Sequence, residues 1–214
     1  MARLGARAGV TPGDYRGAVE IIGVAGGIGA GKSTVTDYLE RRGFAVIDAD
    51  DVAHHVVEPN RPAWRALRDA FGDAVLAPDG NIDRAFLAEV VFHDPTALER
   101  LNRITHGQIG AEIRGQLDQA SGPAVFVALP LFRPEHRAIF SMTRVWGGLA
   151  SFEVALARLV GSRGLDERDA RARLEVQPSN DERLADVDDA IWNEGTKAEL
   201  YARVDELLAA RGLA

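Results

Sequence analysis

The residues with the clearest chemistry in this chain form a glycine-rich segment that ends in a lysine and a serine. Residues 26–33 read Gly-Gly-Ile-Gly-Ala-Gly-Lys-Ser and match the phosphate-binding loop pattern G-x-x-x-x-G-K-[ST] at every fixed position. Glycines let the backbone approach an anion closely, so that successive N–H groups point at phosphate oxygens. Lys32 then reaches the β- and γ-phosphates, and the Ser33 hydroxyl is the expected Mg²⁺ ligand. The segment therefore predicts a nucleoside triphosphate site.

The surroundings of this loop agree with a phosphate site. Residues 19–24 are apolar and β-branched, and residues 33–42 follow a helical pattern, so strand, loop and helix come in the required order. The N-terminus of that helix adds a partial positive charge. Lys32 is one of only two lysines among 25 basic residues, the other being Lys197. The residues expected to contact the triphosphate are Gly26, Gly27, Ile28, Gly29, Ala30, Gly31, Lys32, Ser33 and Thr34.

Acidic residues follow the second apolar run, at residues 44–47. In parallel α/β sheets, ligands lie beyond the carboxyl ends of the strands, where Asp48, Asp50 and Asp51 are found. If the extended conformation persists, Asp48 and Asp50 share one side of the chain. One of them would accept the proton of an attacking hydroxyl or organise Mg²⁺ and its waters. The alternative is that Asp51 or its neighbours cap a helix that starts near Val52.

A cluster of arginines predicts a second feature of a phosphate site. The cluster comprises Arg158, Arg163, Arg168, Arg171, Arg173 and Arg183. A mobile pair of helices carrying these guanidinium groups would close over the phosphates and exclude water. The alternative is a solvated helix face with i,i+4 ion pairs to Glu167, Asp169 and Glu175. We expect that alternative for most of the cluster and phosphate contact for one or two members.

The elements that position these residues follow from the apolar pattern. The predicted strands lie at residues 19–24, 44–47, 124–129, 144–149 and 189–192. Helical segments between them predict a parallel sheet covered on both faces, in one compact α/β unit. Residues 52–121 hold no strand signal, but they hold helical patterns at 62–71, 83–92, with Asp83 as the N-cap, and 95–119. This region is a natural insertion for binding a second substrate.

The expected organisation has four parts. They are an N-terminal extension at residues 1–18, a nucleotide-binding core at 19–51, 122–157 and 186–214, a helical acceptor subdomain at 52–121, and an arginine-rich lid at 158–185.

Composition excludes several classes of function. The net charge of −7 argues against a nucleic-acid or anionic-membrane surface, because both require a basic face. The chain has no cysteine, which excludes disulfides, thiolate catalysis and thiolate metal sites and fits a reducing cytosol. Its 214 residues contain no apolar run near the ~18 residues of a membrane span. We therefore expect a cytoplasmic protein whose partners are small molecules.

Residues 21–59, which read IIGVAGGIGAGKSTVTDYLERRGFAVIDADDVAHHVVEP, resemble the opening of dephospho-CoA kinases. The loop with its Gly-Gly-Ile-Gly core and the Ile-Asp-Ala-Asp block together make the resemblance fairly specific. Further matches in chain order are Gly72-Asp73, Asp79 to Arg84, Val91-Phe92, Leu101 to His106, Pro130-Leu131, Arg158-Leu159, Arg163 to Leu165, Gln177 and Ala190 to Gly195. The resemblance extends over about residues 20 to 211.

The resemblance implies a fold, a reaction and residue roles. The fold is the P-loop NTPase fold of the nucleoside-monophosphate-kinase type, with a parallel five-stranded sheet, a helical acceptor-binding insertion and a lid. The reaction is transfer of the ATP γ-phosphate to the ribose 3′-hydroxyl of dephospho-CoA with Mg²⁺, which is the last step of coenzyme A synthesis. Asp50 is the implied base, Lys32 and Arg163 the phosphate-stabilising cations, and Ser33 the Mg²⁺ ligand.

Other residues are matched to the binding of each substrate. Asp48, Asp50 and His106 are expected at the acceptor, although a lone histidine is more often a packed or hydrogen-bonded structural residue. Asn193 and Gly195 match the loop that lies near the adenine of ATP in this family. An asparagine at such a position also serves as a plain turn residue.

The chain departs from the family pattern at four positions. Ala128 and Leu149 stand where the family usually has aspartates, Ala25 replaces a threonine, and Gly107 follows His106 in place of a proline. A methyl group cannot hold a Mg²⁺ water. The alternatives are therefore a weakened enzyme, a shifted acceptor, or metal duties moved to Asp48 and Asp50.

Three other functions compete with that of a dephospho-CoA kinase. A GTPase would need an Asn-Lys-x-Asp motif, which the chain lacks. A P-loop kinase for another small-molecule alcohol would keep the donor site and change only the helical insertion. A non-catalytic nucleotide-binding homologue is suggested by Ala128 and Leu149. The retention of Lys32, Ser33, Asp50 and Arg163 argues against that homologue.

Overall fold

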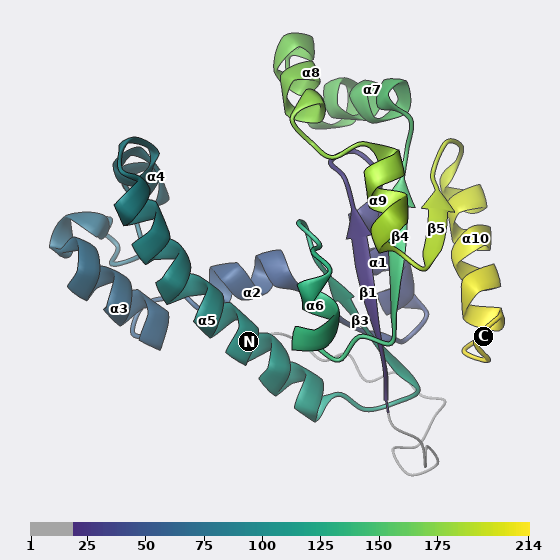
Figure 1. Ribbon diagram of the computed structural model, residues 1–214, viewed down its shortest axis with the longest axis horizontal. Helices are drawn as coiled ribbons and strands as arrows, with labels where there is room; N and C mark the ends of the chain where they lie inside the picture. The colour runs from purple at the N-terminus through teal and green to yellow at the C-terminus, as the bar shows by residue number, and fades with distance from the viewer. Residues whose placement is uncertain (1–18) are drawn as a thin grey trace. The chain divides into compact units, whose positions relative to one another are not determined.

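The computed structural model describes residues 19–214, so the predicted N-terminal extension lies outside the described residues. Five strands form one sheet in the order β2-β3-β1-β4-β5, and the pairs β1–β3, β1–β4 and β4–β5 are parallel (Figure 1). The strands are β1 (Glu20–Gly26), β2 (Ala45–Asp48), β3 (Ala124–Ala128), β4 (Arg144–Leu149) and β5 (Asp189–Trp192). All five were predicted, and no end differs by more than two residues.

Helices connect and cover the strands. Those of the sheet unit are α1 (Lys32–Arg41), α6 (Glu135–Ile139), α7 (Phe152–Arg163), α8 (Glu167–Glu175), α9 (Asn180–Asp186) and α10 (Lys197–Ala209). The remaining helices are α2 (Ala49–His55), α3 (Pro62–Phe71), α4 (Arg84–His93) and α5 (Pro95–Gln119), with a 3₁₀ turn at Asp73–Val75. The sequence did not predict α6, because it is too short for a periodic pattern and its N-cap, Pro134, makes no side-chain hydrogen bond.

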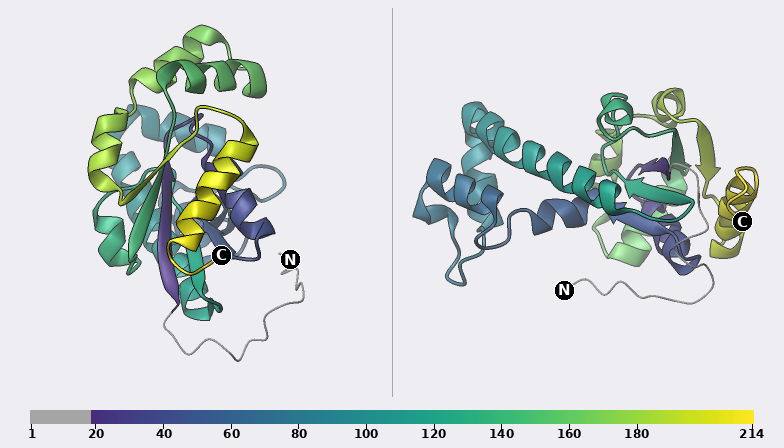
Figure 2. Two further views of the ribbon diagram at one scale, coloured as in Figure 1. Left: turned by 90° about the vertical axis from the view of Figure 1, so that its right-hand side faces the viewer. Right: turned by 90° about the horizontal axis from the view of Figure 1, so that it is seen from below.

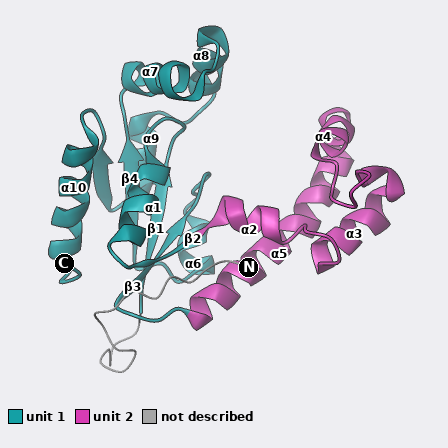
Figure 3. Ribbon diagram, turned by 180° about the vertical axis from the view of Figure 1, so that it is seen from behind, with its two compact units in different colours: residues 1–46, 120–214 teal, residues 47–119 magenta. Residues whose placement is uncertain are grey.

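The chain divides into two compact units, shown in different colours in Figure 3. The described part of unit 1 comprises residues 19–46 and 120–214 and contains the phosphate loop, while unit 2 is Ile47–Gln119 and is helical. The chain passes from one unit to the other within β2 and again after α5.

The main core of unit 1 lies on one face of the sheet. Figure 2 shows α1 and α10 on one side of the sheet and α9 on the other. Ile22, Phe126 and Trp146 are fully buried and pack in one cluster with side chains of α1 and α10. Burying each such side chain contributes about 1.5–3 kcal/mol, so this core holds in place the strand and the helix that the loop connects.

Two glycines lie in the middle of β4. They weaken a strand in isolation, yet β4 forms over its whole predicted length, because β1 pairs with one side of it and β5 with the other. An added Cβ at Gly147 would come within 2.9 Å of both methyl carbons of Val187. Gly147 therefore lets the segment before β5 pack directly against the sheet.

Unit 2 is built around its long helix α5, which contacts α2, α3 and α4. Its core cluster contains Leu67, Val75, Ile82 and Leu87. The predicted N-cap of α4 is confirmed, because the Asp83 carboxylate accepts the Phe86 N–H at 3.0 Å. The helices predicted at residues 62–71, 83–92 and 95–119 thus pack around a second hydrophobic core.

Candidate active site

The phosphate loop joins the end of β1 to the start of α1. Gly31, directly before α1, has φ of 92°, and a Cβ there would overlap the Asn193 amide nitrogen, so only glycine fits. No side chain caps α1, and its first turn contains no acidic residue. The positive end of α1 therefore has no opposing side-chain charge in its own first turn, which suits the binding of an anion.

Asn193 and Arg158 support this loop from outside. Asn193 is 6% exposed, and its Nδ2 donates to the Ala30 carbonyl oxygen at 2.9 Å. Arg158 donates to the Asn193 Oδ1 at 2.9 Å and to the Gly29 carbonyl oxygen at 3.2 Å. Because a trans peptide is planar, holding the Ala30 carbonyl toward Asn193 turns the Gly31 N–H the other way. Asn193 is thus a buried support of the loop rather than a plain turn residue.

The segment after Asn193 is tied to its surroundings by two carboxylates. Glu194 accepts the backbone N–H of Ser151 at 2.5 Å and its hydroxyl at 2.8 Å, which links this segment to the N-cap of α7. Glu199 accepts the Thr196 N–H and hydroxyl in a capping box, and these bonds hold the pKa of Glu199 below its usual value. A Cβ at Gly195 would overlap the Glu199 carboxylate. The capping box therefore explains the glycine.

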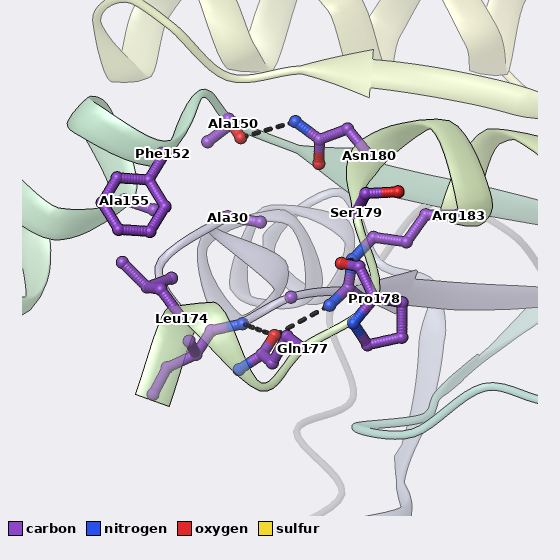
Figure 4. A pocket seen from close by; sticks show the side chains of 12 residues that line it. Ala30, Ala150, Phe152, Ala155, Leu174, Gln177, Pro178, Ser179, Asn180 and Arg183 are labelled. Atoms are coloured by element: carbon purple, nitrogen blue, oxygen red, sulfur yellow. Dashed lines mark hydrogen bonds between the residues drawn. The ribbon is translucent and has the colours of Figure 1, made fainter. Parts of the chain in front are cut away.

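Gln177 and Arg183 contact the first half of the loop. The Gln177 Oε1 accepts the Ile28 backbone N–H at 3.1 Å and an Arg183 N–H at 2.8 Å, and Figure 4 draws both bonds as dashed lines. A Cβ at Gly27 would lie 3.0 Å from each of these two side chains. Burial lowers the pKa of Arg183, and Glu182 opposes the shift. These residues line a pocket of about 270 Å³ beside the loop.

The other arginines of the cluster are exposed. Arg163 is the last residue of α7 and lies five residues, or about 7.5 Å along the helix, beyond Arg158. Arg171 pairs with Glu167 at 2.9 Å, which confirms the predicted i,i+4 pairing for that residue. Of the six arginines, Arg158 donates directly to a carbonyl of the phosphate loop, and Arg183 is linked to the loop through Gln177.

Asp48 is the last residue of β2 and is itself extended, with φ of −91° and ψ of 118°. Helix α2 begins at Ala49, three residues before Val52, and the Asp48 carboxylate caps it by accepting the Asp50 N–H at 2.9 Å. The condition that the chain stays extended through Asp50 is therefore not met, and the alternative that a neighbour of Asp51 caps this helix is confirmed. Asp50 lies in the first turn of α2 and is exposed.

His106 lies on α5 of unit 2 and its side chain is exposed, so it is not a packed core residue. Ser33 is exposed in the first turn of α1. Residues 19–214 contain no group of three or more His, Asp or Glu side chains arranged to hold a metal ion. Mg²⁺ commonly takes one or two protein ligands together with substrate phosphates, and a serine beside the loop fits that arrangement.

The two positions that lack family aspartates lie inside the sheet. Ala128 is 0% exposed and Leu149 is 1% exposed. Leu149 also lines a second pocket of about 260 Å³, together with Gly26 and Arg183. A carboxylate at either position would need a buried partner, and the residues found there are apolar instead.

The sequence predicted the loop and named Arg158, Gln177 and Asn193, but it did not predict the contacts by which they support the loop. The contact between Gln177 and Ile28 spans 149 residues, and that between Arg158 and Asn193 spans 35. No local pattern signals such pairs. Gln177 was marked only by the family resemblance, with no role attached.

Comparison with known proteins gives consistent results. A sequence model of the dephospho-CoA kinase family matches residues 20–199. A dephospho-CoA kinase of Aromatoleum aromaticum is 39% identical over 189 residues, which are 88% of this chain and 92% of that protein. One of Thermobifida fusca is 41% identical over 187 residues, covering 87% of this chain and 93% of the relative.

Solved structures resemble the fold over the same extent. A Thermus thermophilus protein is similar with a TM-score of 0.77 and 27% identity, covering 91% of this chain and 98% of its own. A dephospho-CoA kinase from Campylobacter jejuni is similar with a TM-score of 0.60 and 26% identity, covering the same shares. The predicted P-loop kinase fold is therefore confirmed. No helix within residues 19–214 is long and apolar enough to span a membrane.

Proposed function

The chain belongs to the dephospho-CoA kinase family, the enzymes of the last step of coenzyme A synthesis, and we propose how its own residues carry out that reaction. The observation that carries the proposal is the phosphate loop, whose carbonyls of Gly29 and Ala30 are held by Arg158 and Asn193. Such a loop presents N–H groups to a triphosphate without reorganising. ATP is the phosphoryl donor of a kinase in this family.

The reaction joins the acceptor oxygen to the terminal phosphorus of ATP. The ribose 3′-oxygen of dephospho-CoA forms a bond to the γ-phosphorus, and the bond from that phosphorus to the β,γ-bridging oxygen breaks to release ADP. Asp50 accepts the proton of the 3′-hydroxyl. Its exposed position at the start of α2 supports this role, because the carboxylate is accessible to a bound acceptor.

Cations stabilise the charge on the phosphates. Lys32, the first residue of α1, binds the β- and γ-phosphates, and Arg163 binds the transferred group from the end of α7. Ser33 and the substrate phosphates would hold Mg²⁺, which neutralises developing charge when bound. Thr34 follows in the same helical turn and belongs to the ATP site.

The remaining roles follow the division into units. Unit 2 binds dephospho-CoA through Asp48, Asp50 and His106, residues 158–185 act as a lid, and Gly195 lies near the adenine. Asn193 combines its place near the adenine with its support of Ala30. We also propose that the protein works in the cytoplasm on small molecules alone, since ATP is made and used there. The family membership favours this kinase over another small-molecule kinase or a non-catalytic homologue.

The experiment that tests the function is ADP release by the purified protein with ATP and Mg²⁺, measured with and without dephospho-CoA. The product is identified by mass. Acceptor-dependent ADP release and a product heavier by one phosphoryl group are expected. Nucleotide binding without turnover would contradict the proposal and favour the non-catalytic alternative, in which Ala128 and Leu149 have cost the activity.

A further inference from the structure

We propose that Arg183 is a further catalytic residue that contacts the transferred phosphoryl group, and that Gln177 is its positioning residue. This inference rests on the proposed function, because it concerns the same triphosphate. It selects one arginine of the predicted lid, on α9, to which the family resemblance assigned no individual role.

Two hydrogen-bond donors converge on the side-chain oxygen of Gln177. Its Oε1 lies 3.1 Å from the Ile28 backbone nitrogen and 2.8 Å from an Arg183 nitrogen (Figure 4). A neutral amide oxygen thus occupies the point where a loop N–H and a guanidinium N–H converge. Converging donors of this kind suit an oxygen that carries negative charge, because charge-assisted hydrogen bonds are stronger than neutral ones. A phosphate oxygen fits this position better than a carboxamide does.

The guanidinium group of Arg183 is bonded to neutral groups. Its hydrogen bonds go to two neutral oxygens, the Gln177 Oε1 and the Pro178 carbonyl at 3.1 Å, and no carboxylate within residues 19–214 forms an ion pair with it. The carboxylate next to it in the chain, Glu182, attracts its charge from a distance and opposes the lowering of its pKa, but the Glu182 Oε2 is bonded to the Ser179 N–H and hydroxyl in the capping box of α9. A partly buried guanidinium without an ionic partner is costly unless an anion binds it.

Arg183 differs from Arg171 and Arg173 of the arginine cluster in its surroundings. Arg171 has its charge matched by Glu167, and Arg173 lies in solvent on α8. Arg183 instead borders both pockets next to the loop, of about 270 and 260 Å³. Arg183 is therefore the arginine of the cluster that has space for a phosphate on either side and that is bonded to Gln177, which in turn accepts the Ile28 N–H of the loop.

The role of Arg183 in the reaction is to stabilise charge on the transferred phosphoryl group. An arginine at the transferred phosphoryl group neutralises charge on its peripheral oxygens and takes no part in bond making. Gln177 holds Arg183 against the loop while no phosphate is bound and yields its place to a phosphate oxygen when one arrives. Because ADP lacks the transferred group, Arg183 contributes to turnover and little to ADP affinity.

The experiment compares Arg183→Gln with Arg203→Gln, a matched change at an exposed arginine of α10 outside the lid. We expect kcat of Arg183→Gln to fall on the order of 10²-fold or more, with the ADP dissociation constant changed by less than about threefold. Arg183→Lys should recover only part of the loss, because lysine keeps the charge without the planar fork. Guanidinium ion added to Arg183→Ala should restore part of the rate. Arg203→Gln should resemble the wild type.

A second pair of variants tests the positioning role. Gln177→Glu pairs a carboxylate with Arg183, so it should raise the KM for ATP and lower kcat without lowering the melting temperature. Gln177→Ala should have the smaller effect on kcat. A role in stability alone would lower the melting temperature and activity of both variants together, and that result would overturn the assignment of Gln177.

The outcomes separate this inference from the proposed function. A wild-type protein without acceptor-dependent turnover contradicts the function itself. An active wild type whose Arg183→Gln variant keeps its kcat contradicts only the role of Arg183. Loss of ADP binding in Arg183→Gln, with no rescue by guanidinium, would show that the arginine merely holds the loop together.

Discussion

The two units of the molecule assemble their candidate site residues in different ways. In unit 1, the phosphate loop is bound by side chains from three distant segments, at Arg158, Gln177 and Asn193. In unit 2, Asp50 and His106 are exposed side chains on two helices, and the contacts of those helices form an ordinary hydrophobic core. One site is fixed by hydrogen bonds across the fold, and the other is presented on a surface.

This difference has a consequence for function. A loop whose carbonyls are already bound needs little rearrangement to accept a triphosphate, so substitutions at Arg158 and Asn193, which bind those carbonyls, should affect both stability and nucleotide affinity. Surface residues that contact a ligand contribute little to folding. Substitutions in unit 2 should therefore change kinetic constants for the acceptor and leave stability and nucleotide binding almost unchanged.

The largest effect is expected for Lys32→Ala in unit 1. Removal of the cation at the β- and γ-phosphates should lower kcat by about 10³-fold or more, with the melting temperature unchanged within about 2 °C, because Lys32 is not part of a hydrophobic core. Turnover and thermal unfolding are measured on the same preparation. Lys197→Ala, the other lysine of the chain, is the control. Normal turnover by Lys32→Ala would contradict the assignment of this loop as the ATP site.

The next largest effect is expected for Asp50→Asn in unit 2. An amide cannot accept the proton of the 3′-hydroxyl, so kcat should fall by about 10²- to 10³-fold while ADP binds as before. Asp51→Asn, at the exposed neighbouring position, should keep most of the activity. If Asp50→Asn turns over at the normal rate, the base is another residue and Asp48 becomes the first candidate.

The sequence predicted features whose residues are close together in the chain better than contacts between residues that are far apart in the chain. The loop at residues 26–33 was readable because all its signals are local, as were the strand at 144–149 and the helix at 95–119. The supports of the loop were not, since a hydrogen bond between residues 149 positions apart leaves no periodic trace.

The alternation of strand residues was less informative at residues 48–50. Asp48 is both the last residue of β2 and the N-cap of α2, so the alternation ends there and does not reach Asp50. In unit 1, the reason for Gly147 in β4 left no local signal, because the contact that this glycine permits is with Val187, 40 residues further along the chain.

Asn193→Ala tests the claim that unit 1 is held by its hydrogen bonds. The variant leaves the Ala30 carbonyl and one Arg158 N–H without their partner, which should cost about 1–3 kcal/mol of stability. For a chain of this length, the melting temperature should fall by about 2–4 °C per kcal/mol. The KM for ATP should rise about tenfold as the loop loosens.

Asn193→Asp separates the two hydrogen bonds of this side chain. An aspartate keeps an acceptor for Arg158 and loses the donor to the Ala30 carbonyl. If the bond to Ala30 positions the loop, Asn193→Asp should share the higher KM for ATP and lose less stability than Asn193→Ala. Equal stability and equal KM in all three proteins would contradict the view that the loop is pre-organised from outside.

The smallest effect is expected for His106→Ala, which tests whether unit 2 presents its residues on a surface. An exposed side chain that contacts only the acceptor should raise the KM for dephospho-CoA about three- to tenfold, without changing the KM for ATP or the melting temperature. His93→Ala, at another exposed histidine of unit 2, is the control for general effects on the helices. A lower melting temperature for His106→Ala would mean that the histidine supports α5, and the contrast between the two units would then lose one of its two surface residues.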